Sequence, residues 1–184
     1  MIHADQSGEL LANTRHRGKY RRRGRKARKP TKATNIPNRT SIHDRPKEAD
    51  GKRFGDWEMD LIVGKNGKGA ILVLMERSTN YVTMEKLKHG RNARDTAKAA
   101  IRLLFAYRGK ALKSITTDNG SEFAAHETIS RKLKTKVFFA DSYCAWQKGA
   151  VENTNKLIRQ YIPKGTDFKN VTDRFIMNVQ KKLN

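Results

Sequence analysis

The order of apolar runs along the chain restricts the fold more than any other feature. Three strand-like runs follow one another over short links rich in turn-forming residues, which predicts an antiparallel meander over residues 57–63, 70–75 and 81–87. Beyond them we expect helices that alternate with strands: helices over residues 93–105, 122–133 and 150–161, and strands over 113–117 and 136–140. This order predicts an α/β fold, with one mixed five-stranded sheet flanked by helices on both faces.

The first 50 residues differ in character from the rest. Between residues 15 and 32 there are eleven Lys or Arg, no Asp or Glu, and no apolar periodicity. We therefore expect residues 1–50 to form a basic arm, disordered or extended, and residues 51–184 to form the folded core, with order beginning near Phe54. The alternative is a solvated basic tail without a function. The functional interpretation is an arm that follows DNA phosphates, through residues that include Arg21, Arg22, Arg23, Arg25 and Lys26.

The charge of the chain indicates its partner. Lys and Arg number 40 against 18 Asp and Glu, so the net charge is +22, which favours a polyanion and predicts DNA. A membrane is not expected as a partner, because no apolar stretch approaches about 20 residues and no secretory signal follows Met1. The single cysteine, Cys144, excludes an internal disulfide framework and a Cys-rich zinc site. We expect a cytoplasmic, nucleoid-associated protein.

Three carboxylates stand where metal-dependent chemistry needs them. Asp60 lies within the first strand-like run, Asp118 ends the fourth, and Glu152 opens the helix over 150–161. Carboxylate oxygens are the ligands that Mg²⁺ and Mn²⁺ prefer, and two such ions about 3.5–4 Å apart suit phosphodiester cleavage. The pattern predicts a site for Mg²⁺, with Mn²⁺ as a substitute and two ions in all. Taken singly, each carboxylate is more often an ordinary surface, loop or helix-start residue.

Other carboxylates compete for these roles. Strand alternation places Asp56 and Glu58 on the same face as Asp60, and we prefer Asp60 because the apolar run 61–63 embeds it in the sheet. Asp56 is expected at the mouth of the strand. Glu122 and Asp141 are weaker candidates, on a helix and a loop.

The last predicted helix presents polar residues beside Glu152. Asn155, Lys156 and Arg159 follow it by three, four and seven residues, so they share its face. We interpret them as contacts to DNA phosphates, and the alternative is an ordinary charged helix surface. Trp146, just before the helix, is expected in the core or as a loop anchor, with base stacking as the alternative.

At these residues the chain resembles DDE transposases with a retroviral-integrase-type catalytic core, and more closely the bacterial insertion-sequence-thirty family. The main matching stretches are FGDWEMD (54–60), TDNGSEF (117–123) and ENTN (152–155), with further matches at 36–39, 45–46, 143, 146–147, 159–161 and 163–168. The resemblance implies a ribonuclease-H-like fold with Asp60, Asp118 and Glu152 as the catalytic, metal-binding triad. It further implies Mg²⁺-dependent cleavage at inverted-repeat ends, strand transfer into target DNA, and a homo-oligomer on paired DNA ends.

The chain also departs from that family. Such transposases usually begin with helix-turn-helix segments and continue into a closing segment, so we expect a chain truncated at both ends. Asp56 stands where the family more often has His. Two alternatives to a transposase core therefore stay open: a catalytically inactive DNA-binding remnant, and a simple ribonuclease-H-type nuclease. Because cleavage uses water and strand transfer uses a DNA 3′-hydroxyl, neither Ser121 nor Cys144 is proposed as a nucleophile.

Overall fold

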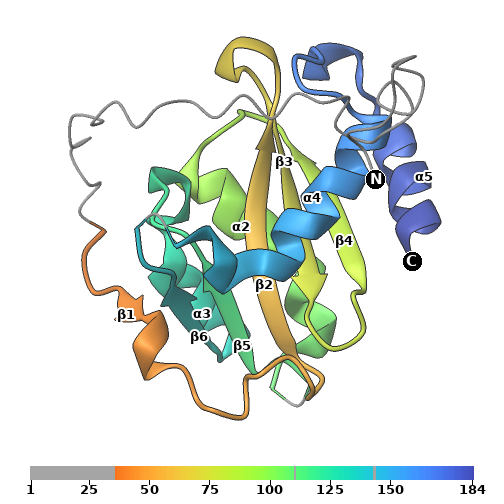
Figure 1. Cartoon of the computed structure of the whole chain (residues 1–184). Helices are drawn as coiled ribbons and strands as arrows, with labels where there is room; N and C mark the ends of the chain where they lie inside the picture. Colours follow the sequence, from red (N-terminus) through yellow and green to blue (C-terminus); the bar gives the residue numbers. More distant parts are fainter. Residues whose placement is uncertain (1–35, 110, 143) are drawn as a thin grey trace, which may run out of the picture. The chain divides into compact units, whose positions relative to one another are not determined.

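The computed structural model describes residues 36–184, except 110 and 143. One six-stranded sheet runs through them in the order β1-β6-β5-β2-β3-β4 (Figure 1). The predicted meander is confirmed, since β2, β3 and β4 pair antiparallel. The remaining strands pair parallel, so the sheet is mixed. The strands are β1 (Thr40–Ser41), β2 (Asp56–Val63), β3 (Ala70–Glu76), β4 (Val82–Leu87), β5 (Ser114–Thr117) and β6 (Lys136–Phe139).

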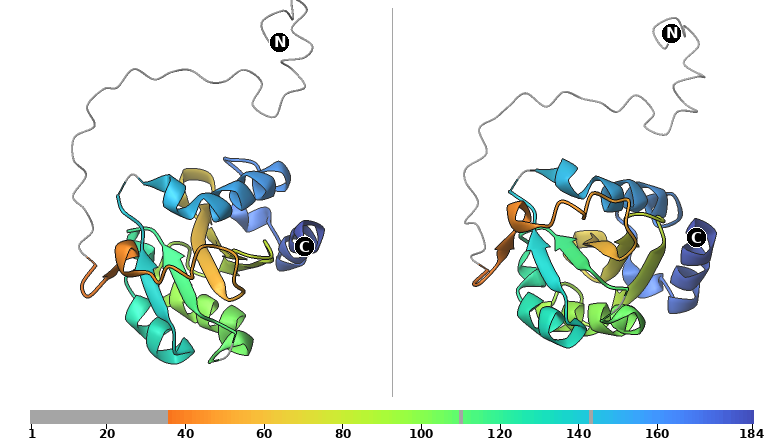
Figure 2. Two further views of the ribbon diagram at one scale, coloured as in Figure 1. Left: turned by 60° about the horizontal axis from the view of Figure 1, so that its bottom comes forward. Right: turned by 90° about the horizontal axis from the view of Figure 1, so that it is seen from below.

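Both faces of the sheet are covered, as predicted. Along β3, Leu72 and Leu74 belong to one buried cluster, and Ile71 and Val73 belong to another. Because successive side chains of a strand point to opposite faces, this alternation places one cluster on each side of the sheet. Figure 2 shows the helices on either side of the strands.

Four α-helices contribute the side chains that pack against the strand residues in these two clusters. The helices α2 (Ala93–Leu104) and α3 (His126–Leu133) pack into the first cluster, and α4 (Gly149–Tyr161) and α5 (Asp173–Leu183) pack into the second. The expected helix over 122–133 is divided into a 3₁₀ turn, Ser121–Phe123, and α3. None of the helices in the described ranges is long and apolar enough to cross a membrane.

The ordered part begins earlier than Phe54. Ile36 and Ile42 are buried, and β1 pairs in parallel with the end of β6, Thr40 opposite Phe138. The sheet therefore has six strands, one more than expected, and residues 36–50 pack against the core instead of belonging to a free arm. The five Arg and Lys residues proposed as the DNA contacts of the arm, Arg21 to Lys26, lie outside the described residues.

Candidate metal and DNA site

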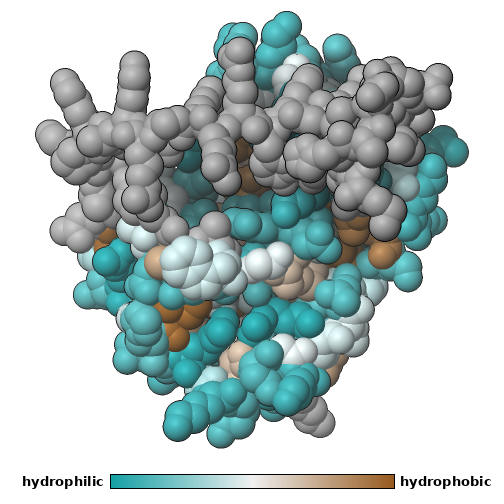
Figure 3. All heavy atoms as spheres, in the orientation of Figure 1, coloured by the Kyte–Doolittle hydropathy of each residue, from teal (hydrophilic) through white to brown (hydrophobic). Residues whose placement is uncertain are grey.

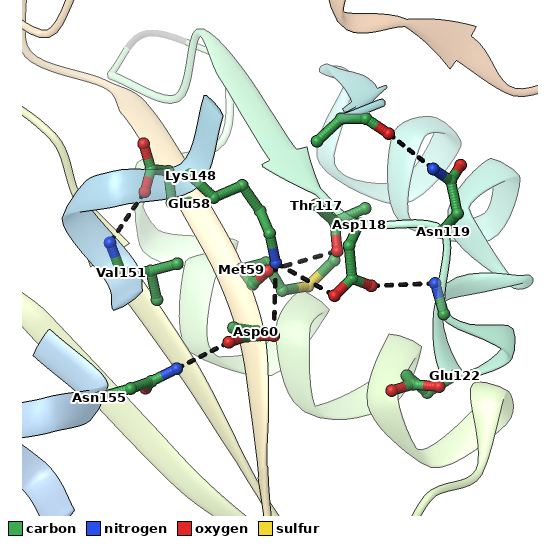
Figure 4. A network of polar contacts seen from close by, with 12 residues as sticks. Glu58, Met59, Asp60, Thr117, Asp118, Asn119, Glu122, Lys148, Val151 and Asn155 are labelled. Carbon is green, nitrogen blue, oxygen red and sulfur yellow. Dashed lines mark hydrogen bonds and ion pairs between the residues drawn. The ribbon is translucent and has the colours of Figure 1, made fainter. Parts of the chain in front are cut away.

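Two of the three predicted carboxylates lie side by side. In the parallel pairing of β2 with β5, Glu58 lies opposite Thr116. The same register, continued by two residues, brings Asp60 beside Asp118, which directly follows β5. The topology of the sheet therefore joins two carboxylates that are 58 residues apart in the sequence (Figure 4).

A lysine that the sequence did not single out lies between them. The Nζ of Lys148 is 3.3 Å from Oδ1 of Asp60 and 3.3 Å from Oδ2 of Asp118. Only 5% of the Lys148 side chain is exposed, against 46% of that of Asp118. One buried ammonium thus serves both carboxylates, which is the arrangement that a buried charge requires.

The second oxygen of each carboxylate is held by a neutral donor. Nδ2 of Asn155, on α4, donates to Oδ2 of Asp60 over 2.7 Å. The backbone N–H of Gly120 donates to Oδ1 of Asp118 over 2.9 Å. Each aspartate therefore has one oxygen fixed by a neighbour and one oxygen directed at Lys148 (Figure 4).

The pKa values reflect this crowding. Burial raises the pKa of Asp60; the ammonium of Lys148 opposes the shift and the charge of Asp118 adds to it. Burial alone would lower the pKa of Lys148, but attraction to Asp60 and Asp118 outweighs it, so that pKa is raised. Asp60 and Lys148 are thus both largely shielded from water, and each favours the charged form of the other.

The third predicted ligand, Glu152, does not join them. Across the described ranges, 36–184 without 110 and 143, no group of three or more His, Cys, Asp or Glu could hold a metal ion. Glu152 lies in the first turn of α4, three residues before Asn155, which contacts Asp60. Residues three apart on a helix share a face, so Glu152 is one turn from the residue that reaches Asp60.

The competing carboxylates are engaged elsewhere. Glu58 is buried; its Oε2 accepts from the N–H of Val151 over 2.8 Å, and its Oε1 pairs with Nε of Arg77 at 3.1 Å. Burial raises the pKa of Glu58, and the bond from Val151 and the charge of Arg77 oppose this. Asp56 is the first residue of β2, at the mouth of the strand as expected, and its buried carboxylate pairs with Arg53.

The two weaker candidates also have partners. Glu122 pairs with Arg91 at 2.9 Å, and Asp141 pairs with His43 at 2.8 Å. Neither contacts Lys148, which among the described residues pairs with Asp60 and Asp118.

The polar face of α4 divides into different roles. Asn155 touches Asp60, whereas Lys156 is exposed. The guanidinium of Arg159 donates to the carbonyl of Val63 over 2.9 Å and ties α4 to β2. Trp146 was expected in the core or as an anchor, but it is 74% exposed.

Comparison with known proteins shows the family of this chain. Residues 51–144 match the family model described as integrase core domain. The transposase of insertion sequence element IS4351 from Bacteroides fragilis is 49% identical over 150 residues, which cover 81% of this chain and 45% of that protein. The transposase InsI of IS30A from Escherichia coli K12 is 35% identical over 150 residues, covering 81% of this chain and 39% of that protein.

A solved structure shows the same fold. A chain of the simian T-cell lymphotropic virus intasome, in complex with PP2A regulatory subunit B56 gamma, superimposes with a TM-score of 0.53 at 19% identity. The match covers 71% of this chain and 47% of that one. The predicted ribonuclease-H-like fold is thereby confirmed. The chain spans less than half the length of each of these two transposases.

Proposed function

The chain belongs to the integrase core domain family, and we propose that it is the catalytic core of a DDE transposase of the insertion-sequence-thirty type. It would cleave DNA at inverted-repeat ends and join those ends to target DNA, as a homo-oligomer on the paired ends. One observation carries the proposal. Asp60 on β2 and Asp118, directly after the neighbouring strand β5, each direct a carboxylate oxygen at the ammonium of Lys148.

The residues at this point fit a divalent metal ion. The Lys148 ammonium is a stand-in cation, and two carboxylate oxygens already point at it from different strands. Carboxylate oxygen is the donor that Mg²⁺ and Mn²⁺ select. Asp60 and Asp118 would therefore hold the metal, and Glu152 would complete the set from the start of α4.

Once bound, a pair of Mg²⁺ ions supplies the activation of the attacking oxygen and the stabilisation of the leaving oxygen. The residues of the chain orient the ligands. Asn155 fixes one carboxylate oxygen of Asp60, and the Gly120 N–H fixes one of Asp118. The other oxygen of each aspartate is directed at the position that the Lys148 ammonium occupies. Because the carboxylates are oriented beforehand in this way, they do not have to reorganise during the reaction.

The experiment that tests this function is metal-dependent nicking of supercoiled plasmid by the purified chain. We expect nicked circles with Mg²⁺ or Mn²⁺ and none when EDTA is added, because the crowded carboxylates need a divalent cation to act on a phosphodiester. A labelled duplex with a free 3′-hydroxyl, added to the same reaction, measures joining. Nicking that persists in EDTA would contradict the metal site. DNA binding without nicking would favour the inactive remnant, and hydrolysis of RNA in hybrids without joining would favour a ribonuclease-H-type nuclease.

A basic groove, formed where three loops meet, supports DNA as the substrate. The backbones of the loops approach closely, because a Cβ on Gly90 would lie 3.4 Å from the Gly69 nitrogen and one on Gly69 would lie 2.9 Å from Cβ of Phe168. Five Lys or Arg and one acidic residue, Asp167, line the groove; the basic residues are Lys68, Lys86, Lys88, Arg91 and Lys169. Where the described residues are visible in Figure 3, hydrophilic residues make up most of the surface, between smaller hydrophobic patches.

The groove adjoins the segment that follows Asp118. Arg91 pairs with Glu122, four residues beyond Asp118. Lys68, Lys88 and Lys169 are exposed and take part in no ion pair among the described residues. Three unneutralised ammonium groups on a rigid framework suit the regularly spaced phosphates of DNA.

Replacing Lys68, Lys88 and Lys169 together by Ala is expected to weaken binding of an arbitrary DNA duplex and to flatten its salt dependence. Each lost phosphate contact lowers the slope of log affinity against log salt by about 0.9, so the slope should fall by roughly 2–3. Fluorescence anisotropy over a salt series measures it. A matched triple replacement of the exposed Lys132, Lys134 and Lys136 removes the same charge at α3 and β6. Equal effects of the two triples would show that only net charge matters.

A further inference from the structure

Lys148 is unlike the other lysines of the described residues in its surroundings. Its side chain is 5% exposed, and its ammonium lies 3.3 Å from a carboxylate oxygen on either side. Placing such a group out of water is costly, and the cost is offset only while both partners are ionised and close. The position of the ammonium is therefore a consequence of the Asp60–Asp118 pair.

The surroundings prepare the two aspartates for a shared cation. Their outer oxygens are held by Asn155 and by the Gly120 N–H, which are neutral and would remain after an exchange of cations. The Oδ1 of Asn155 is buried and has no hydrogen-bond partner within the described residues. The aspartates are thus oriented from behind by groups that are independent of Lys148 (Figure 4).

The segment that carries Lys148 favours a movement of the side chain alone. Lys148 is the last residue of the 3₁₀ turn Ala145–Lys148, and its side chain caps no backbone group of α4. Three residues later, the N–H of Val151 is anchored to Glu58 of β2 over 2.8 Å. With the start of α4 anchored in this way, the flexible Lys148 side chain can rotate away while the helix keeps its place.

We propose that Lys148 is a built-in counter-ion, which keeps the Asp60–Asp118 pair assembled before a divalent ion arrives and gives up its place when the ion binds. The inference rests on the proposed function, because it assumes that this pair binds metal. It assigns Lys148 a positioning role: the lysine prevents the two carboxylates from separating and sets a threshold that a metal ion must overcome. No bond is made or broken in this exchange.

The test compares Lys148→Met with the parent chain, by melting temperature and by Mn²⁺ titration calorimetry. Without metal we expect Lys148→Met to melt several degrees lower, because two crowded carboxylates lose their only cation among the described residues. With Mn²⁺ we expect binding that is tighter by about tenfold or more, the scale on which neighbours of metal ligands alter affinity, and a larger rise in melting temperature. Lys132→Met, at an exposed position of α3, is the matched control and should change neither quantity.

Two further variants keep the result decisive. Lys148→Gln, whose amide can still donate to a carboxylate, repeats the comparison if Lys148→Met does not fold, and it should also bind Mn²⁺ more tightly. Lys148→Arg keeps the cation and should not gain affinity. Unchanged or weaker Mn²⁺ binding in Lys148→Met or Lys148→Gln, beside a parent that binds Mn²⁺, would overturn this inference alone. Absence of Mn²⁺ binding in the parent and in every variant would overturn the proposed metal site together with it.

Discussion

Asp118→Asn and Glu152→Gln are each expected to reduce metal-dependent plasmid nicking by at least about a hundredfold, the loss that follows removal of one preorganised electrostatic group from an active site. The amides keep the size and shape of the side chains, so the lost quantity is negative charge. For Asp118 the expectation follows from its contact with the Lys148 ammonium, which it shares with Asp60. For Glu152 it follows from its place on α4, one turn before Asn155.

The same two variants should differ in stability without metal. Asp118→Asn removes one of the two carboxylates that surround Lys148, so its melting temperature should fall. Glu152 belongs to no metal-holding group of the described residues, and its replacement costs only a first-turn charge, about 0.3–1 kcal/mol. Equal activity losses with unequal melting temperatures would therefore identify Glu152 as a ligand that joins the site only when metal is bound.

Both variants can be measured beside one control. Asp173→Asn changes an exposed carboxylate in the first turn of α5, as Glu152→Gln does in the first turn of α4, and it should leave nicking unchanged. Nicking is followed by gel electrophoresis with Mg²⁺ and with Mn²⁺, and melting by circular dichroism with EDTA. Full nicking by Glu152→Gln would remove Glu152 from the proposed triad, and equal nicking by both variants and the parent would indicate a contaminating nuclease.

Glu58→Ala is expected to destabilise the fold by about 3–5 kcal/mol, the range for a buried ion pair that loses one partner. Without this carboxylate, the N–H of Val151 loses its acceptor and the largely buried guanidinium of Arg77 loses its counter-ion. The start of α4 would then lose its attachment to β2, so nicking should decrease as well, through Lys148 and Glu152 on the same segment.

Denaturant unfolding checks this expectation. Glu58→Gln is the informative companion, because its amide oxygen can still accept from Val151 while the charge opposite Arg77 is gone. Its loss of stability should lie between those of the parent and Glu58→Ala. If Glu58→Ala unfolds at the same denaturant concentration as the parent, the contact between β2 and α4 is not the anchor inferred here.

Sequence patterns alone predicted five of the six strands described, and they allowed Asp60 and Asp118 to be neighbours. The apolar runs and their periodicity predicted β2 to β6 and the helices between them. This was possible because the spacing of apolar residues along each segment shows whether a strand or a helix can bury them. The sequence also placed Asp60 and Asp118 on strands that could become neighbours, and the parallel register of β2 with β5 makes them so. The family resemblance rested on motifs around the same residues, and the match over residues 51–144 confirms it.

The remaining features required the folded chain, because each of them depends on partners that are distant in the sequence. β1 has two residues, too few for any periodic signal, and it exists because it pairs with β6 nearly a hundred residues later. Glu58 and Asp60 share a strand face, but the position of α4 decides their different partners. Glu58 accepts a hydrogen bond from the N–H of Val151, and Asp60 accepts one from the amide of Asn155. Lys148 showed no sequence signal, because a lysine is ordinarily solvated, and its burial is offset only where folding brings two carboxylates around it.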